Sequence, residues 1–327
     1  MLPATTRSLL HILGFFLLTL LSFHAGYSQE VAANFPSRPI TYVNPIAPNN
    51  STDTAVRLLS KQAEKFLKQT IEVVNKVGGS TTIGTGYLAA AKPDGYTIGY
   101  VAHSGFYVVP LLQKVSYHPL RDLTPILQWA GLNVGIAVKG DGPFKSFKDI
   151  VEYARNNPKK VAYGTDGPTS MQHIIVQQIG FREKVEFIHK PYEGPAALDA
   201  AVLKGEITFE VGISTASAIE SGQIRFLVML KDEPSAEYPS VPILKDLGYT
   251  IPCPMGVNIF APKDIDPTIA QKLEDAFTKA MKEPEFISGM KEMRVPIVYR
   301  NSKELDAYMR RSFNEYAQFL KEMGLVK

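Results

Sequence analysis

The sequence predicts an α/β protein with two lobes, each a mainly parallel sheet flanked by helices, and with a ligand cleft between the lobes. Three observations favour this fold class. The chain of 327 residues is long enough for two domains, strand-like segments alternate with amphipathic helical ones, and this alternation starts again near residue 135. Sheets of this kind bind ligands in the loops at the carboxyl ends of their strands, so we expect a site in those loops.

Residues 1–28 are predicted to be a secretory signal peptide. Arg7 precedes an apolar stretch at 9–21, and the small residues of 25–28 follow it, an order that is typical of exported proteins. We expect cleavage after Ser28 or, alternatively, after Ala25 or Gly26. The apolar stretch is too short to favour a permanent membrane span, so the mature protein is expected to be soluble and exported.

The first lobe is predicted to begin with repeated strand–loop–helix units. In order, we expect a strand at 40–43, a helix at about 53–66, a strand at 70–74, a short helix ending before Pro93, and a strand at 96–101. The loops at 45–53, 77–84 and 102–106 should lie together at one edge of the sheet. Asp53 stands near the start of the first helix, where unpaired N–H groups and the positive end of the helix dipole favour a carboxylate.

The second lobe repeats the same pattern. In order, we expect a strand at 133–138, a helix at 146–156, strands at 161–163 and 185–189 with a helix around 172–179 between them, a helix at 196–204, and strands at 207–211 and 224–230. An apolar segment at 257–260 and two amphipathic helices, about 267–281 and 303–323, follow. We therefore expect residues 29–133 and 256–327 to form lobe 1, and residues 134–255 to form lobe 2.

Charge and cysteine content argue against several classes of function. The 35 basic and 32 acidic residues give a formal net charge of +3, and no long basic run supplies the positive surface that nucleic-acid binding needs. Cys253 is the single cysteine, so we expect no internal disulfide or multi-cysteine zinc site and a small core residue instead. Because metal-site spacings and nucleophile motifs are missing, we expect no metal, no cofactor and no enzymatic activity.

Two glycine-rich patterns are similar to nucleotide-binding motifs but lack an essential part of each. The segment 79–85 has phosphate-loop spacing without the lysine that reaches the outer phosphates. The segment 84–89 matches the loose dinucleotide fingerprint, yet only Asp94, in a turn, follows as an acid for the ribose. What remains is a set of loops whose hydroxyls, amides and N–H groups can hold an anion without any reaction.

A series of short segments then appears in a characteristic order and spacing. These are 45–53, Asn75-Lys76 with Gly78-Gly79 and Ile83-Gly84, 93–97, Ser104-Gly105, 117–120 with 122–125, Tyr163-Gly164 with Thr169-Ser170, 191–194, Ser221-Gly222 with Ile224-Arg225, and 239–242. The ordered set resembles the periplasmic solute receptors of the tripartite tricarboxylate transporter family over essentially residues 35–327. The resemblance implies a periplasmic-binding-protein-like fold, a periplasmic location, hinge closure on a small carboxylate held mostly by loop backbone and ordered water, and delivery to the membrane permease subunits of the transporter.

The expected ligand-binding residues come from both lobes. They are Ala47, Asn50, Ser51, Thr52, Asp53, His103 and Ser104 in lobe 1, and Thr169, Ser170 and Tyr192 in lobe 2. His103 is included because it lies in a predicted strand-end loop beside Ser104. Asp53 should repel a bare carboxylate, so it either caps its helix, binds ordered water, or meets an amine on the ligand.

Two loops depart from the family's pattern. Pro48-Asn49-Asn50 stand where the family usually has a small residue and glycines, Ile46 replaces the usual aromatic residue, and Val77 with 80–82 replace the usual proline and glycines. Asparagine tolerates left-handed backbone, but its side chain occupies space near the ligand. We therefore expect an altered ligand choice, with neutral drift at a solvent-facing loop as the alternative. We also expect a monomer, and two further functions stay open: a sensor of ligand occupancy for a signalling partner, and an exported enzyme.

Overall fold

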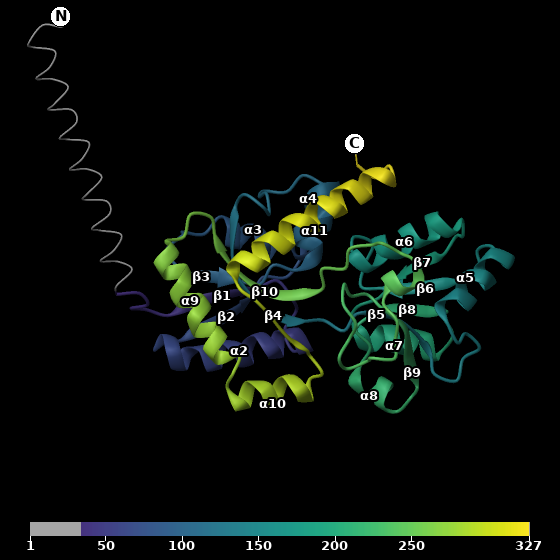
Figure 1. Ribbon diagram of the computed structural model, residues 1–327, viewed down its shortest axis with the longest axis horizontal. Helices are drawn as coiled ribbons and strands as arrows, with labels where there is room; N and C mark the ends of the chain where they lie inside the picture. The colour runs from purple at the N-terminus through teal and green to yellow at the C-terminus, as the bar shows by residue number, and fades with distance from the viewer. Residues whose placement is uncertain (1–33, 327) are drawn as a thin grey trace, which may run out of the picture.

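The computed structural model describes residues 34–326 and has two lobes, each built on its own sheet (Figure 1). The predicted signal peptide lies outside the described residues. Among the residues described, no helix is both long enough and apolar enough to span a membrane. The chain passes from the first sheet to the second between Gly131 and Gly135, and it returns between Met229 and Gly256.

The sheet of the first lobe has six strands. In spatial order they are β11 (Ile297–Arg300), β4 (Leu123–Gly131), β10 (Gly256–Pro262), β3 (Thr97–Gly99), β1 (Ile40–Asn44) and β2 (Ile71–Asn75). β1 pairs in parallel with both β2 and β3, whereas β10 is antiparallel to β3 and β4, and β11 is antiparallel to β4. The sheet is therefore mixed with a parallel part, which corrects the expectation of a mainly parallel sheet. The antiparallel half contains β4 and β11, two strands that the sequence pattern did not predict.

Helices cover the first sheet. They are α2 (Ser51–Leu67), α3 (Thr82–Ala89), α4 (Val109–Leu112), α9 (Pro267–Ala280), α10 (Pro284–Glu292) and α11 (Ser302–Glu322), with the short turns η1 (Gly79–Thr81) and η2 (Ser104–Val108). α2 packs against α9 and α10, while α11 packs along β4 and η2. The fully buried Trp129 of β4 lies edge-on to Phe286 of α10, with ring centroids 6.1 Å apart. Burial of such large rings fixes the helices on the sheet.

The sheet of the second lobe has five strands. In spatial order they are β7 (Ile188–Pro191), β6 (Ala162–Thr165), β8 (Phe209–Gly212), β5 (Gly135–Lys139) and β9 (Ile224–Met229). β6 is parallel to β7 and β8, and β5 is antiparallel to β8 and β9, so this sheet is also mixed. Its helices are α5 (Phe147–Asn156), α6 (Met171–Glu183), α7 (Pro195–Leu203), α8 (Ala216–Glu220) and the turn η3 (Leu244–Leu247).

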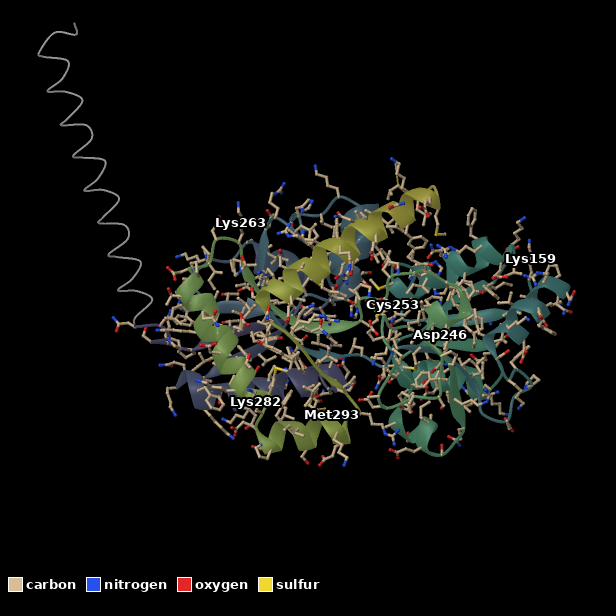
Figure 2. The ribbon with its side chains drawn as sticks, in the orientation of Figure 1. Lys159, Asp246, Cys253, Lys263, Lys282 and Met293 are labelled. Carbon is tan, nitrogen blue, oxygen red and sulfur yellow. The ribbon has the colours of Figure 1, made fainter. Side chains whose placement is uncertain are left out.

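The two lobes contact each other on several sides. α11 extends from the first lobe towards α6 of the second (Figure 1), and the Tyr316 hydroxyl lies 3.4 Å from the Met171 carbonyl. Cys253, in the segment that returns to the first lobe, lies between the lobes (Figure 2). It is buried, and burial raises the pKa of its thiol well above the ordinary value. Cys253 is therefore an inert packing residue, as the sequence predicts.

Candidate functional site

A cavity of about 220 Å³ lies between the lobes. Its walls come from the strand-end loops of the first lobe, from the crossing segment, and from the second lobe. The lining residues are Ile46, Asn50, Ser51, Thr52, Thr81, Tyr100, Ala102, His103, Ser104, Leu132, Val134, Asp166, Gln172, Gly194, Pro195, Leu198, Gly212 and Ile213. Five of the predicted site residues, Asn50, Ser51, Thr52, His103 and Ser104, are therefore brought together here. A cavity of mixed polar and apolar lining between two domains is the usual form of a small-molecule site.

The first lobe presents the N-terminus of α2 to this cavity. Asn50 is the N-cap: its backbone is extended, and its Oδ1 accepts a hydrogen bond of 2.8 Å from the Asp53 N–H. The first intrahelical bond of α2 runs from the Thr54 N–H to the Asn50 carbonyl at 2.9 Å, which leaves the N–H groups of Ser51 and Thr52 outside the helical ladder. Free N–H groups at the positive end of a 17-residue helix attract an anion.

Asp53 does not line the cavity, and its carboxylate instead accepts hydrogen bonds from other groups of the first lobe. It accepts hydrogen bonds from Asn44 Nδ2 at 2.9 Å, Asn75 Nδ2 at 2.7 Å, the Asn49 N–H at 3.2 Å and Arg57 Nε at 2.9 Å. Burial alone would raise the pKa of Asp53, but these hydrogen bonds outweigh it and hold the pKa below its usual value. The carboxylate is thus ionised, paired with Arg57, and ties the 45–50 loop to β1 and β2.

His103 lines the cavity beside Ser104. Burial lowers the pKa of His103 to about 4, while a hydrogen bond from its ring to the backbone of Gly256 acts in the opposite direction. The ring is therefore neutral at neutral pH. Its Nε2 has no hydrogen-bond partner among the described residues. In a neutral ring whose other nitrogen donates a hydrogen bond, Nε2 is an acceptor.

Thr81 is a cavity residue that the sequence analysis missed. Its Oγ1 accepts a 3.0 Å hydrogen bond from the Gly105 N–H. A Cβ built on Gly105 would lie 2.6 Å from that oxygen, so a side chain at position 105 would push Thr81 away. Thr81 lies in the predicted loop 77–84 and Gly105 in the predicted loop 102–106, but the direct contact between these two residues was not predictable.

The second lobe contributes different residues from those expected. Thr169, Ser170 and Tyr192 lie outside the lining, as does Ala47 of the first lobe, whose carbonyl accepts from Asn50 Nδ2 at 3.0 Å. Thr169 Oγ1 instead lies 2.5 Å from Ser80 Oγ and bridges the lobes. Ser170 caps α6 by accepting from the His173 N–H at 3.2 Å. Ligand contact by these residues and by Asp53 stays a prediction.

Asp166 and Gln172 are the polar side chains that the second lobe places in the lining. Asp166 follows β6 directly and is the only charged residue of 164–170; a charge placed at the end of a predicted strand was the signal that could have identified it. No lysine or arginine lines the cavity. With His103 neutral, Asp166 is the one ionisable group of the lining able to bring a full charge at neutral pH.

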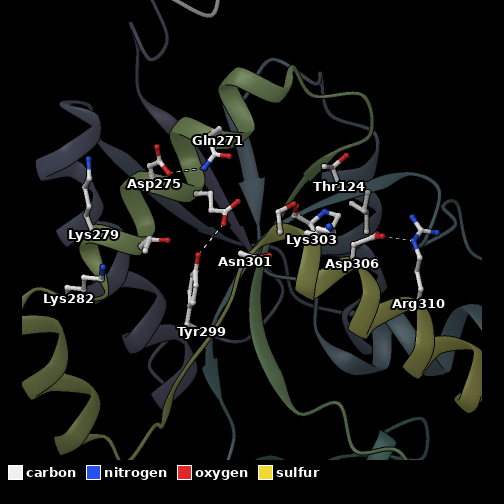
Figure 3. Close-up of a pocket in the computed structure, with 15 residues that line it drawn as sticks. Thr124, Gln271, Asp275, Lys279, Lys282, Tyr299, Asn301, Lys303, Asp306 and Arg310 are labelled. Atoms are coloured by element: carbon white, nitrogen blue, oxygen red, sulfur yellow. Dashed lines mark hydrogen bonds and ion pairs between the residues drawn. The ribbon is translucent and has the colours of Figure 1, made fainter.

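A larger groove, of about 970 Å³, lies on the first lobe between α9 and α11 (Figure 3). None of the predicted site residues lines it. Its acidic side chains contact near neighbours: Asp306 pairs with Arg310 at 2.8 Å, Asp275 accepts from Gln271 at 2.8 Å, and Glu274 accepts from Tyr299 at 3.2 Å. Because this groove lies on one lobe, away from the strand-end loops, it is weaker evidence for a ligand site than the smaller cavity between the lobes.

Two α/β lobes with an anion-attracting helix terminus in the cavity between them define a two-lobed solute-binding protein. The family model "Tripartite tricarboxylate transporter family receptor" (TctC) matches residues 55–325, and the chain belongs to this family. Its members are the solute-binding receptors of tripartite transporters and not enzymes. Family membership, the two-lobed fold and the assignment as a receptor confirm three predictions made from the sequence.

Individual relatives agree with this assignment. A Cupriavidus necator protein called "UPF0065 protein in gbd 5′ region" is 33% identical over 302 residues, which cover 92% of each chain. The solved structure of the periplasmic binding protein BugD is 26% identical, with a TM-score of 0.74 over 90% of this chain and all of that one. The structure of MatC from Rhodopseudomonas palustris with bound malate has the same fold, at 22% identity and a TM-score of 0.73, over 88% of this chain and all of that one.

Proposed function

We propose that this protein captures a small organic carboxylate in the periplasm and delivers it to the permease subunits of a tripartite tricarboxylate-type transporter. The N-terminus of α2 carries the proposal. It brings the free N–H groups of Ser51 and Thr52 and their hydroxyls to a cavity between the lobes. The nearest acid on α2, Asp53, is paired with Arg57 and does not compete for these groups.

The comparisons support a carboxylate as the ligand. The family is named for tricarboxylate transport, and MatC, which has the same fold, holds malate. The proposal also includes an N-terminal signal peptide at 1–28 that is removed on export. It includes the division into lobe 1 at 29–133 and 256–327 and lobe 2 at 134–255.

A thermal-shift screen tests the proposed ligand class. A compound that binds only the folded protein stabilises it by about 2.7 kcal/mol at 100 times its dissociation constant. Mono-, di- and tricarboxylates, amino acids and aromatic acids should include at least one that raises the unfolding midpoint, whereas sugars and polyamines should not. A rise with a sugar or polyamine and with no carboxylate would overturn the proposal. Mass spectrometry of the denatured protein, which identifies copurifying molecules, provides an independent check.

Closure of the lobes is the second part of the proposal. The Ser80–Thr169 hydrogen bond across the cleft should form only when the lobes are together, and a ligand that touches both lobes should favour that state. Small-angle scattering should therefore show a smaller radius of gyration at saturating carboxylate than without it. An unchanged profile would argue for a site formed by one lobe. Uptake of the same carboxylate by cells should require both this protein and the permease.

A further inference from the structure

We propose that the ligand of this cavity is a carboxylate that also carries an ammonium group, and that Asp166 is the residue that selects it. This inference rests on the proposed carboxylate site at the N-terminus of α2. It goes further by assigning a negative charge to the opposite wall of the cavity. A ligand that matches both walls is a zwitterion with one carboxylate and one ammonium group, and not a dianion such as malate.

The distribution of charge around the cavity is the first argument. The first lobe offers hydrogen-bond donors, the N–H groups and hydroxyls of Ser51 and Thr52, which suit an anion. The second lobe offers the carboxyl group of Asp166, and the lining contains no lysine or arginine to neutralise it. A second carboxylate on the ligand would therefore face Asp166 without a compensating cation, and like charges in such a site disfavour each other.

The surroundings of Asp166 are the second argument. No ion pair within residues 34–326 includes it. Asp166 is exposed to solvent, although protein atoms near its carboxyl group raise the pKa of Asp166, an effect that hydrogen bonds from its own backbone and from Ser170 only partly oppose. Asp53, by contrast, already has Arg57. Compared with Asp53, Asp166 is thus the acid whose ionised form would gain from a cation supplied by a ligand.

The shape and polarity of the remaining wall are the third argument. Leu132, Val134, Leu198 and Ile213 give the middle of the cavity an apolar wall, which suits a short hydrocarbon body between two polar ends. The unpartnered Nε2 of His103 adds a second hydrogen-bond acceptor. A ligand with N–H donors satisfies both acceptors, whereas a dicarboxylate satisfies neither.

Calorimetry with matched probes tests the inference. Alanine, β-alanine and 4-aminobutyrate are zwitterions, propionate and butyrate lack the amine, and succinate and malate replace it with a second carboxylate. We expect at least one zwitterion to bind about tenfold or more tightly than both the amine-free acids and the dianions, because a hydrogen bond to a charged group is worth at least that factor. Tighter binding of succinate or malate than of every amino acid would contradict this inference but not the proposed function as a carboxylate receptor. If no carboxylate binds, both this inference and the proposed function are wrong.

Two variants identify the residue responsible. Asp166→Asn should weaken the zwitterion by about tenfold and strengthen succinate, while binding of butyrate should change little. Glu193→Gln is the matched control, because it removes an exposed acid from the neighbouring loop of the same lobe but outside the cavity lining. Glu193→Gln should leave all three affinities unchanged. Equal effects of the two variants, or no effect of Asp166→Asn on the ratio of zwitterion to dianion, would remove Asp166 from the selecting role.

Discussion

Each lobe buries a carboxyl group near the cleft, but the two groups have opposite surroundings. In the first lobe, Asp53 is 1% exposed and accepts hydrogen bonds from Arg57 and three other donors. In the second, Glu210 is fully buried on β8 beside a second acid, Asp199, and receives a hydrogen bond from Ser214. No ion pair of the described chain includes Glu210 or Asp199.

The consequence is an opposite shift of acidity in the two lobes. The pKa of Asp53 is held below its usual value. Burial raises the pKa of Glu210 to about 8, the charge of Asp199 and a hydrogen bond with it add to this rise, and Ser214 opposes it. Glu210 is therefore a protonated acid at neutral pH, whereas Asp53 is an anion. Burial alone does not decide the charge of an acid; the donors around it do.

Acids of both lobes support loops of the cleft. Asp53 holds the 45–50 loop that leads to the start of α2. Asp199 accepts from the Thr215 N–H at 3.1 Å, and Thr215, which caps α8, lies two residues after Ile213 of the cavity wall. The first lobe stabilises its loop with an ion pair, and the second with hydrogen bonds to a carboxyl group that forms no ion pair within the described residues.

The largest effect is expected from Asp53→Ala. The variant should lose about 3 kcal/mol of unfolding free energy, because the buried Asn44 and partly buried Asn75 amides lose their acceptor and each such orphaned donor costs about 1–3 kcal/mol. Urea denaturation measures the change. Asp306→Ala is the matched control: Asp306 forms the same i,i+4 pair with an arginine, at 2.8 Å, but on an exposed face of α11. It should cost less than about 0.5 kcal/mol, and equal losses would contradict the contrast.

The next effect concerns pH and Glu210→Gln. In the unfolded chain Glu210 ionises near its ordinary value of 4.5, whereas in the folded chain it keeps its proton up to about 8. The unfolded chain therefore loses its proton first, and this group lowers stability as pH rises through that window, by at most about 1.4 kcal/mol per pH unit. Denaturation at pH 5, 6.5 and 8 should show that the stability of the glutamine variant, relative to that of the wild type, increases with pH. A constant difference would show that Glu210 is not protonated.

The stability contributed by Asp53 and by the buried histidines rises with pH, opposite to that of Glu210. The pH dependence must therefore be read from the difference in unfolding free energy between the glutamine variant and the wild type. The lowered pKa of Asp53 gives stability that is present above its ordinary pKa and lost as pH falls through the folded value. Burial, with the nearby charge of His189, lowers the pKa of His173 to about 4, so its contribution is lost as pH falls from 6.5 towards 4. These groups are the same in both proteins and cancel in the difference.

A smaller effect on stability is expected from Ser170→Ala. Because Ser170 Oγ caps α6 and donates to Thr165 Oγ1 at 3.2 Å, its loss should lower the unfolding free energy by about 1 kcal/mol. Denaturation of the ligand-free protein measures this. A stability equal to that of the wild type, with weakened carboxylate binding, would show that Ser170 serves the ligand and not the helix.

The smallest effect is expected from Ser51→Ala, the counterpart of Ser170 in the first lobe. Ser51 is exposed at the start of α2 and its hydroxyl forms no hydrogen bond in the described structure, so stability should not change. Affinity for the carboxylate that gives the largest thermal shift should fall about two- to tenfold, the loss of one hydrogen bond. Unchanged affinity in calorimetry would remove the hydroxyl of Ser51 from the site.

Local patterns predicted some elements closely and missed others for identifiable reasons. The helices expected at 267–281 and 303–323 correspond to α9 and α11, because their amphipathic period and N-capping residues are local signals. β4 was missed because its residues from Ile126 to Gly131 are buried on both faces, including Gln128, so no alternation marks it. β11 is a four-residue strand whose place depends on pairing with β4. Without these two strands, the antiparallel half of the first sheet could not be predicted.

The sequence by itself determined the family, the two-lobed fold, and the meeting of loops 45–53 and 102–106 at one cavity, since capping, period and loop order are local properties. Only the tertiary structure decided the surroundings of the carboxyl groups of Asp53 and Asp166. The carboxylate of Asp53, on α2, accepts a hydrogen bond from Asn75 on β2, 22 residues away in the chain, and Asp166 forms no ion pair within the described residues, where the cavity lining contains no lysine or arginine. The charge of a carboxyl group depends on all the donors and protein atoms that surround it, and part of this set comes from residues distant in the chain, which local sequence patterns do not reveal.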